Sequence, residues 1–395
     1  MINYNKVLLR FGEVGLKGKN RSYFINGLAA NIRRALRPLG RGYRVSTPYG
    51  RIFVDLPPDH DFDQVSEALQ RVFGLVSFSP VVQTDLDMDG IRAAALQELL
   101  AAGPPATFKV AARRSLKSFA LNSMEINRDV GGYLLDNCPG LKVDVHNPQQ
   151  LVHIEVRREG AFVFSQIIPG PGGLPVGVTG RGVLLLSGGI DSPVAGWLAM
   201  KRGVSLEAVY FDTPPFTSPR ALTKVETLAG ILAKWAPVNL HVVNFTPVQR
   251  ALMENVPEDL TITIMRRFMF RVAEALARRR GALALITGES IGQVASQTLE
   301  SMLTINQVVS LPVLRPVVAM DKVEIMELSR RIGTYETSIE PFQDCCGLFV
   351  SPHPKTRPTL AQADLAEKDL EVAALVDVAL EGITTKHFQG GEVKV

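Results

Sequence analysis

The sequence has 395 residues, more than one hydrophobic core of usual size contains, so we expect two or three domains. Apolar residues make up 46% and charged residues 21%, and no apolar run is long enough to cross a membrane. The first residues lack a secretory signal, and the three cysteines are too few for a disulfide framework and too badly spaced for a paired-cysteine metal site. We expect a cytoplasmic protein without a metal site of its own.

The net charge is +4, but the first 44 residues are strongly basic. They hold one acid, Glu13, against ten basic residues: Lys6, Arg10, Lys17, Lys19, Arg21, Arg33, Arg34, Arg37, Arg41 and Arg44. A basic face gains affinity for a polyanion by releasing counterions from its phosphates. A solvated face is the alternative interpretation, which suits shorter charge runs better. The asymmetry therefore favours a nucleic-acid partner.

The first 82 residues predict alternating strands and helices. Apolar runs predict strands over 7–10, near 43–45, over 52–54 and over 75–82, with helices over 20–36 and 62–72. This βαββαβ order is that of the split ferredoxin-like fold.

Residues 85–166 predict a second small α/β module. Its helices are expected over 88–100 and 123–136, and its strands over 108–112, 151–156 and 161–166. Arg113, Arg114 and Lys117 come directly after the first of these strands, where loop residues are free to contact phosphate.

A change of composition then marks a domain boundary. Nine of the fourteen residues from 169 to 182 are Gly or Pro, which supports neither helix nor strand. Near-continuous apolar strands are predicted after it, over 183–186, 206–211, 240–245, 283–287 and 311–318, with helices such as 262–280 and 322–332. Such a pattern predicts a doubly wound parallel sheet, in which ligands bind beyond the carboxyl ends of the strands.

The first of these strands runs into Ser187-Gly188-Gly189-Ile190-Asp191-Ser192, followed by Pro193 and a helix. The glycines permit a tight turn, the serines offer hydroxyls, and the free N–H groups of the helix start face the loop, so the segment suits an anion. A Walker-type lysine is absent. The segment resembles the PP-loop of ATP pyrophosphatases, which adenylate a substrate and release pyrophosphate. A glycine-rich turn without a ligand is the alternative.

Further motifs extend this resemblance: Tyr210-Phe211-Asp212, Arg266-Arg267, the stretch 288–298, and Asp321-Lys322. Together with the basic start, they resemble the tRNA 4-thiouridine synthetases, the ThiI family, over nearly the whole chain. The resemblance implies an N-terminal ferredoxin-like domain over 1–75, a THUMP RNA-binding domain over 62–168 with an overlapping boundary, a linker over 169–182 and a PP-loop domain over 183–395.

The function implied by the resemblance is ATP-dependent transfer of persulfide sulfur to uridine 8 of tRNA, giving 4-thiouridine through an adenylated uridine. The THUMP module would grip the acceptor end of tRNA. The implied cofactors are ATP and Mg²⁺, and the implied partners are tRNA, a cysteine desulfurase or other persulfide donor, and a second copy of the chain. A further role in passing sulfur to ThiS for thiamine synthesis depends largely on a C-terminal rhodanese domain. We expect none, because the sequence ends after a single helical stretch over 360–380.

The resemblance also assigns site residues. The nucleotide site would comprise Leu185, Leu186, Ser187, Gly188, Gly189, Ser192, Tyr210, Phe211, Arg266, Gly288 and Gln297, with Arg267 as the alternative to Arg266. Gln293 and Gln297 are four residues apart, so we expect them to share a helix face. The candidate RNA-binding residues are Lys17, Lys19, Arg21, Arg113, Arg114 and Lys117, and the catalytic residues would be Asp191, Lys322 and Cys346.

Lys322 is also singled out by a physical argument. Asp321 and Glu324 read as the N-cap and the capping-box acid of a helix, so Lys322 lies in the first turn, where a cation opposes the helix dipole. A phosphate ligand explains its presence better than an indifferent surface position.

The sulfur chemistry is expected at a cysteine with a lowered pKa. Cys346 matches the family's catalytic cysteine, and His353, Lys355 and Arg357 follow it and could supply positive charge. Cys345 is either a resolving partner or a spectator. Cys138 is expected to be a small buried residue at a helix end.

Other functions fit part of the pattern. A 2-thiolating PP-loop enzyme or an amidotransferase-like ligase would share the loop, but the basic N-terminal domains argue against the ligase and the lack of a CxxC pair argues against an iron–sulfur thiolase. A non-catalytic RNA-binding protein with an inert nucleotide fold is the alternative from another class.

Overall fold

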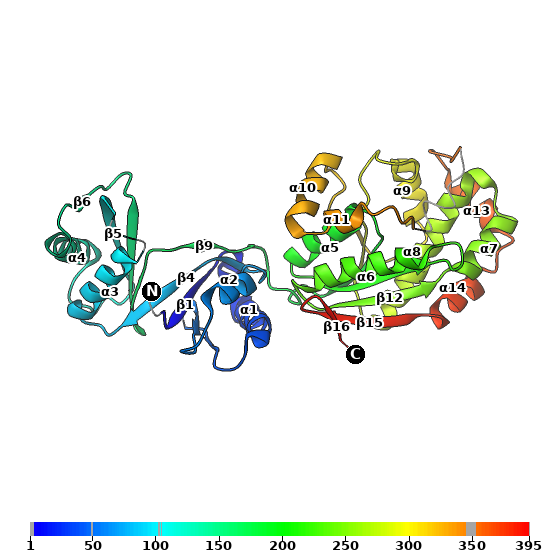
Figure 1. Ribbon diagram of the computed structural model, residues 1–395. Helices are drawn as coiled ribbons and strands as arrows, with labels where there is room; N and C mark the ends of the chain where they lie inside the picture. Colours follow the sequence, from blue (N-terminus) through cyan, green and yellow to red (C-terminus); the bar gives the residue numbers. More distant parts are fainter. Residues whose placement is uncertain (1–3, 49, 102, 104, 345–352, 395) are drawn as a thin grey trace. The chain divides into compact units, whose positions relative to one another are not determined.

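The computed structural model describes residues 4–48, 50–101, 103, 105–344 and 353–394. The chain divides into two compact units, one ending at Gly173 and the other beginning at Leu174 (Figure 1). Within the described residues, no helix is both long and apolar enough to cross a membrane.

The first half of the N-terminal unit confirms the predicted βαββαβ order. Its elements are β1 (Lys6–Phe11), the short 3₁₀ helices η1 (Glu13–Leu16) and η2 (Gly18–Asn20), α1 (Arg21–Leu36), η3 (Arg37–Leu39), β2 (Arg44–Ser46), β3 (Ile52–Asp55), α2 (Phe62–Leu69) and β4 (Leu75–Thr84). The strands lie in the antiparallel order β2-β3-β1-β4. Alternate residues of β1, such as Val7 and Leu9, pack against α1 residues Leu28 and Ile32 in one fully buried core.

The second half of this unit continues the same sheet. It contains α3 (Met88–Leu100), β5 (Thr107–Arg114), α4 (Ser123–Asn137), β6 (Lys142–Val143), β7 (Gln150–Arg157), β8 (Gly160–Phe164) and β9 (Ile168–Pro169). Strand β4 is ten residues long: its first part pairs with β1, and residues 82–84 pair with β8. The order is therefore β2-β3-β1-β4-β8-β7-β5-β6, and the two predicted modules share one sheet.

Three predictions for this unit need correction. Arg113 and Arg114 do not follow the strand as loop residues, because β5 extends through Arg114 and pairs along β7 as far as Val156. The Gly/Pro-rich segment is also shorter than predicted, since Pro169 belongs to β9 and Arg181 begins the next strand. Cys138 does lie at the end of α4, but it is only half-buried.

The second unit is a doubly wound sheet, as predicted. Its elements are β10 (Arg181–Leu185), α5 (Asp191–Lys201), β11 (Ser205–Asp212), α6 (Pro219–Ala233), β12 (Val238–Asn244), α7 (Thr246–Asn255), η4 (Glu258–Leu260), α8 (Thr261–Arg280), β13 (Ala284–Ile286), η5 (Ala295–Gln297), α9 (Leu299–Asn306), β14 (Val313–Leu314), α10 (Lys322–Ile332), α11 (Tyr335–Ser338), α13 (Leu360–Glu367), α14 (Val372–Glu381), β15 (Thr384–Gln389) and β16 (Glu392–Lys394). The strand order is β14-β13-β10-β11-β12-β15-β16, and the first five of these strands are parallel.

Two groups of helices pack in this unit. Helices α5, α6, α10 and α11 contact one another, while α7, α9, α13 and α14 gather around the long helix α8 (Figure 1). Phe268 and Phe270 of α8 are fully buried in the larger core with Val209 of β11. The central strands are thus covered by apolar side chains, which agrees with their near-continuous apolar sequences.

The C-terminal part differs from its prediction. The expected single helical stretch over 360–380 is two helices, α13 and α14, and it is followed by the strands β15 and β16. Strand β15 pairs antiparallel with β12, and Phe388 is buried there. Strand β14 covers only Val313–Leu314 of the predicted 311–318.

Candidate functional site

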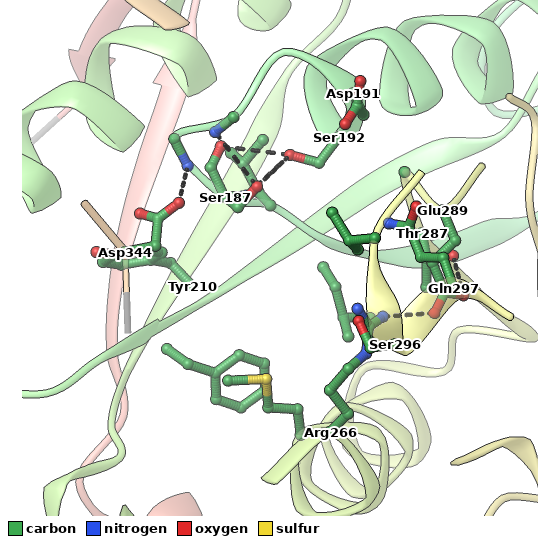
Figure 2. A pocket seen from close by; sticks show the side chains of 18 of the residues that line it. Ser187, Asp191, Ser192, Tyr210, Arg266, Thr287, Glu289, Ser296, Gln297 and Asp344 are labelled. Carbon is green, nitrogen blue, oxygen red and sulfur yellow. Dashed lines mark hydrogen bonds and ion pairs between the residues drawn. The ribbon is translucent and has the colours of Figure 1, made fainter. Parts of the chain in front are cut away.

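A cavity of about 550 Å³ opens in the second unit beyond the carboxyl ends of β10, β11 and β13 (Figure 2). All eleven predicted nucleotide-binding residues line it, together with Asp191: Leu185, Leu186, Ser187, Gly188, Gly189, Ser192, Tyr210, Phe211, Arg266, Gly288 and Gln297. Parallel strands end at one edge of a sheet, so loops distant in the sequence converge there.

The loop from Ser187 to Ser192 is held in a tight turn by its own side chains. The backbone N–H of Ser187 donates to Ser192 Oγ at 2.9 Å, and the two hydroxyls are 3.0 Å apart. Helix α5 begins at Asp191, so its first N–H groups face the loop. A side chain at Gly288 would come within 2.5 Å of the Ser192 nitrogen, so only glycine permits the β13 loop to approach this closely.

Asp191 connects this loop to two other segments. Lys322 Nζ donates to Asp191 Oδ1 at 2.9 Å, and Gln293 Nε2 donates to Oδ2 at 3.0 Å. Lys322 is the first residue of α10, and the predicted capping box of Asp321 and Glu324 is present. The carboxylate, an exposed ammonium group and the helix start of α5 therefore meet at the mouth of the cavity.

Arg266 faces the cavity from α8 and rests on a buried carboxylate. Glu289, which is 2% exposed, forms ion pairs with Arg266 and with Arg315, and accepts a hydrogen bond from Thr287. Burial by itself raises the pKa of Glu289, but the two arginine charges and the hydrogen bonds outweigh it and lower the pKa. Arg267 points elsewhere, to Glu367, so the structure favours Arg266 over its neighbour.

The prediction that Gln293 and Gln297 share a helix face is wrong. Gln297 ends the one-turn 3₁₀ helix η5, and Gln293 lies outside it in a bend, because Gly292 adopts a φ of +78° and interrupts the backbone. The two amides have different surroundings. Gln297 is 8% exposed and lines the cavity, whereas Gln293 donates to Asp191.

Two charged residues of the cavity wall escaped the sequence analysis. Lys224 of α6 is 5% exposed and donates to the backbone oxygen of Glu340 at 2.8 Å. Asp344 Oδ2 accepts from the Gly188 N–H at 2.8 Å, next to Tyr210 (Figure 2). A signal existed for Lys224, because it interrupts the buried apolar stripe of α6; Asp344 carries no comparable pattern.

Burial dominates the electrostatics of both groups. It raises the pKa of Asp344, against the lowering effects of the Gly188 N–H, the Lys224 charge and the Tyr210 hydroxyl. It lowers the pKa of Lys224, against the raising effects of Asp344 and Glu340.

The predicted catalytic Cys346 and its neighbour Cys345 lie outside the described residues. Asp344, which precedes them in the sequence, lines the cavity. Of the cations expected to lower a cysteine pKa, Lys355 is 3.7 Å from Asp259 and Arg357 is 3.7 Å from Glu300. Both charges are therefore shared with acids.

The candidate RNA-binding residues occupy two places in the first unit. Lys17 pairs with Glu13 at 2.8 Å and lies over the Phe24 ring, while Arg21 lies over Phe11 and Lys19 is exposed. These residues surround the start of α1.

The second place is the end of β5 and the loop after it. Arg113 and Lys117 are exposed, but Arg114 donates to the backbone oxygens of Lys117 and Phe119 at 3.1 and 2.9 Å. Arg114 therefore braces the loop, and its guanidinium is less available to a ligand. Among the described residues, no group of three or more His, Cys, Asp or Glu side chains could hold a metal ion.

Known protein families match three regions of this chain. Family models match for the ThiI ferredoxin-like domain over residues 6–79, the THUMP domain over 87–166 and the thiamine biosynthesis protein (ThiI) over 177–372. The chain is 53% identical to the probable tRNA sulfurtransferase of Moorella thermoacetica, covering 96% of this chain and 97% of that one. It is 51% identical to the probable tRNA sulfurtransferase of Brevibacillus brevis, covering 98% of both.

A solved structure is similar over the same length. The crystal structure of a 4-thiouridine synthetase–RNA complex with bound ATP matches at 39% identity and a TM-score of 0.90, covering 98% of this chain and 100% of that chain.

Proposed function

Because this chain belongs to the ThiI family of tRNA sulfurtransferases, we propose that it transfers sulfur to uridine 8 of tRNA in an ATP-dependent reaction that gives 4-thiouridine. The observation that carries the proposal is the convergence of the SGGIDS loop and the other predicted nucleotide residues on one cavity, with Asp191 and Lys322 at its mouth.

ATP is the nucleotide that this cavity would hold. The backbones of Leu185-Leu186 and Tyr210-Phe211 are suited to adenine and ribose, and Arg266 is oriented by Glu289 toward the same space. The start of α5 favours the phosphates through the N–H groups of its first turn. Mg²⁺ would accompany the phosphates.

The first chemical step would activate the uridine. The C4 oxygen attacks the α-phosphorus, pyrophosphate leaves, and the oxygen becomes part of an AMP leaving group. Negative charge develops on the phosphates in this step, and Lys322 is the exposed cation at the cavity mouth that could stabilise it. Asp191 holds the Lys322 ammonium in place through the 2.9 Å contact.

The second step would deliver sulfur from a persulfide on Cys346. The outer sulfur attacks C4, and AMP departs with the former uridine oxygen. A second thiol then attacks the Cys346 sulfur, which breaks the S–S bond, leaves the outer sulfur on C4 and forms a disulfide that an external thiol reduces. Cys345 is one candidate for the second thiol, and a spectator role is the alternative.

The first unit would bind the tRNA. Two sets of residues are placed to meet phosphates: Lys17, Lys19 and Arg21 around the start of α1, and Arg113 at the end of β5 with Lys117 in the loop after it. The THUMP match covers the second set. Arg114 would contribute through its loop and less by direct contact. The domain boundaries proposed for these modules remain 1–75 and 62–168, with the linker over 169–182 and the PP-loop domain over 183–395.

The remaining partners follow from the chemistry. A cysteine desulfurase or another persulfide donor would load Cys346, and a homodimer would let one copy present tRNA to the other. Sulfur transfer to ThiS is a possible second role. We place the protein in the cytoplasm because its proposed substrates, tRNA and ATP, are there.

The decisive experiment is mass analysis of tRNA nucleosides after incubation with ATP, a desulfurase and cysteine. 4-Thiouridine should appear only with ATP, and Asp191→Ala should abolish it while tRNA affinity changes by less than about twofold. Accumulation of 2-thiouridine instead would favour a different PP-loop thiolase. The absence of any thiolated nucleoside with full tRNA affinity would favour the non-catalytic alternative.

A further inference from the structure

Residues 338–344, which we term the approach segment, lie against the nucleotide loop and α6. Ser338 Oγ donates to the Gly189 oxygen at 3.4 Å, and Asp344 accepts from the Gly188 N–H at 2.8 Å. Between these two contacts, Lys224 Nζ donates to the backbone oxygen of Glu340 at 2.8 Å. The segment is thus fastened at its start, in its middle and at its end, to residues between 116 and 156 positions earlier in the sequence.

Lys224 is an unusual residue for this position. Its stem packs directly on the loop, since a Cβ at Gly188 would lie 3.1 Å from Lys224 Cδ and 3.2 Å from Cε. Its ammonium group donates to backbone oxygens of the approach segment at Glu340 and, more weakly, at Phe342. Burying an ammonium group is costly unless its hydrogen bonds are made, so this residue is best explained by holding that backbone.

Asp344 completes the attachment from the other side. Its carboxylate accepts a charge-assisted hydrogen bond from the loop backbone, and Lys224 lies close enough to oppose the effect of burial on its pKa. Arg220 on α6 lies over the Phe342 ring at 5.4 Å and adds a cation–π contact between the same two elements. The activation step described above assigns no role to Lys224 or Asp344, although both line the nucleotide cavity.

We propose that Lys224 and Asp344 are positioning residues, which fix the chain directly before Cys345 and Cys346 against the nucleotide loop so that sulfur and the activated uridine meet. This inference rests on the proposed function. An adenylated uridine that waits for its sulfur is exposed to water, and hydrolysis returns uridine and AMP. Accurate placement of the approach segment would decide whether the persulfide sulfur or water attacks the adenylated uridine.

The test measures pyrophosphate and 4-thiouridine from the same reaction, with the full chain, tRNA, ATP, a desulfurase and cysteine. In Asp344→Ala and in Lys224→Met, the ratio of 4-thiouridine to pyrophosphate should fall roughly 10-fold to 100-fold, because small misplacements of reacting groups have effects of this size. Both products are measured at saturating ATP, because Lys224 and Asp344 also line the nucleotide cavity and their loss can change the KM for ATP. Asp344→Asn keeps an oxygen for the Gly188 N–H and should recover most of the ratio.

Arg271→Met is the matched control, because it removes another partly buried ion pair, with Glu367, away from the approach segment. It should lower thermal stability without changing the ratio. A parallel loss of both products in the two test variants, or an unchanged ratio, would overturn the positioning role. Two variants on different elements keep the test informative if one does not fold.

The measurements also distinguish a failure of the positioning role from a failure of the proposed function. A wild-type protein that forms neither pyrophosphate nor 4-thiouridine would overturn the proposed function and the positioning role together. A wild type that forms both, with variants that stay fully coupled, would overturn the positioning role alone.

Discussion

The second unit gathers its predicted nucleotide-binding residues around one cavity, whereas the first unit keeps its predicted RNA-binding residues in two separate places. In the second unit the residues follow parallel strands, and hydrogen bonds such as that between Ser187 and Ser192 fix the backbone that presents them. In the first unit they are long cationic side chains around the start of α1, at the end of β5 and in the loop after it. A nucleotide needs a defined enclosure, but phosphates along an RNA backbone can be met by separated charges.

The largest effect is expected at the cysteine. Cys346→Ser should abolish 4-thiouridine while ATP-dependent pyrophosphate release persists, because serine cannot carry a persulfide. Cys345→Ser should be milder. Nucleoside mass analysis and pyrophosphate measurement on the same samples check both, and equal activity in both variants and the wild type would refute the persulfide role.

Lys322→Met should come next in size. It keeps the length of the side chain but removes the charge that contacts Asp191, and kcat should fall by roughly 10²–10³-fold, the effect of losing one group that stabilises developing charge. RNA affinity should not change, since the residue belongs to the second unit. Steady-state kinetics and a filter-binding assay would show this, and a loss of RNA affinity would contradict the separation of roles.

Glu289→Gln should affect ATP binding more moderately. Arg266 would lose the carboxylate that orients it, so we expect the KM for ATP to rise about 10-fold, with kcat changed less. Glu274→Gln, on the same helix as Arg266 but paired with Arg278, is the control, and its KM should stay close to wild type. An unchanged KM in Glu289→Gln would remove Arg266 from the nucleotide site.

Glu289 should also make the stability of the second unit sensitive to acid. The pKa of Glu289 is lowered on folding, so its contribution to stability is complete above the ordinary glutamate pKa and is lost as the pH falls through the lowered folded value. The thermal unfolding temperature of the wild type should therefore fall as the pH drops below about 4.5. Glu289→Gln should remove part of this pH dependence. Identical profiles of unfolding temperature against pH for the wild type and Glu289→Gln would contradict this contribution of Glu289.

The smallest effect is expected in the first unit. Lys17→Ala should weaken tRNA binding only a few-fold and reduce the slope of log affinity against log salt by about one, the change expected for one phosphate contact. Lys368→Ala, an exposed lysine of the second unit beside Asp369, is the control and should leave the slope unchanged. A wild-type affinity independent of salt would refute the phosphate-contact role of the basic stretch.

Local patterns were sufficient for several elements. The capping box of Asp321 and Glu324 predicted the start of α10 at Lys322, and the SGGIDS segment predicted a strand, a tight turn and a helix in that order. These features depend on neighbouring residues, so the sequence window contains the interactions that produce them.

Patterns failed where the determining partner is distant. Arg114 was expected in a loop, but pairing with β7 extends its strand, and the hairpin of β15 and β16 exists because β12 offers an edge. Gln293 and Gln297 have helical spacing, yet Gly292 and the close packing of their loop override it.

The sequence by itself determined the nucleotide loop, the βαββαβ order at the start of the first unit, the parallel strands of the second, and the basic character of the first unit. Each of these features is encoded in adjacent residues or in composition. Only the tertiary structure decided that Lys224 and Asp344 meet at Gly188, that Arg266 and not Arg267 faces the cavity, and that Asp191 holds both Lys322 and Gln293. The reason is physical: these contacts join segments up to 156 residues apart, and chain folding brings such segments together through the packing of the whole sheet, which no local pattern encodes.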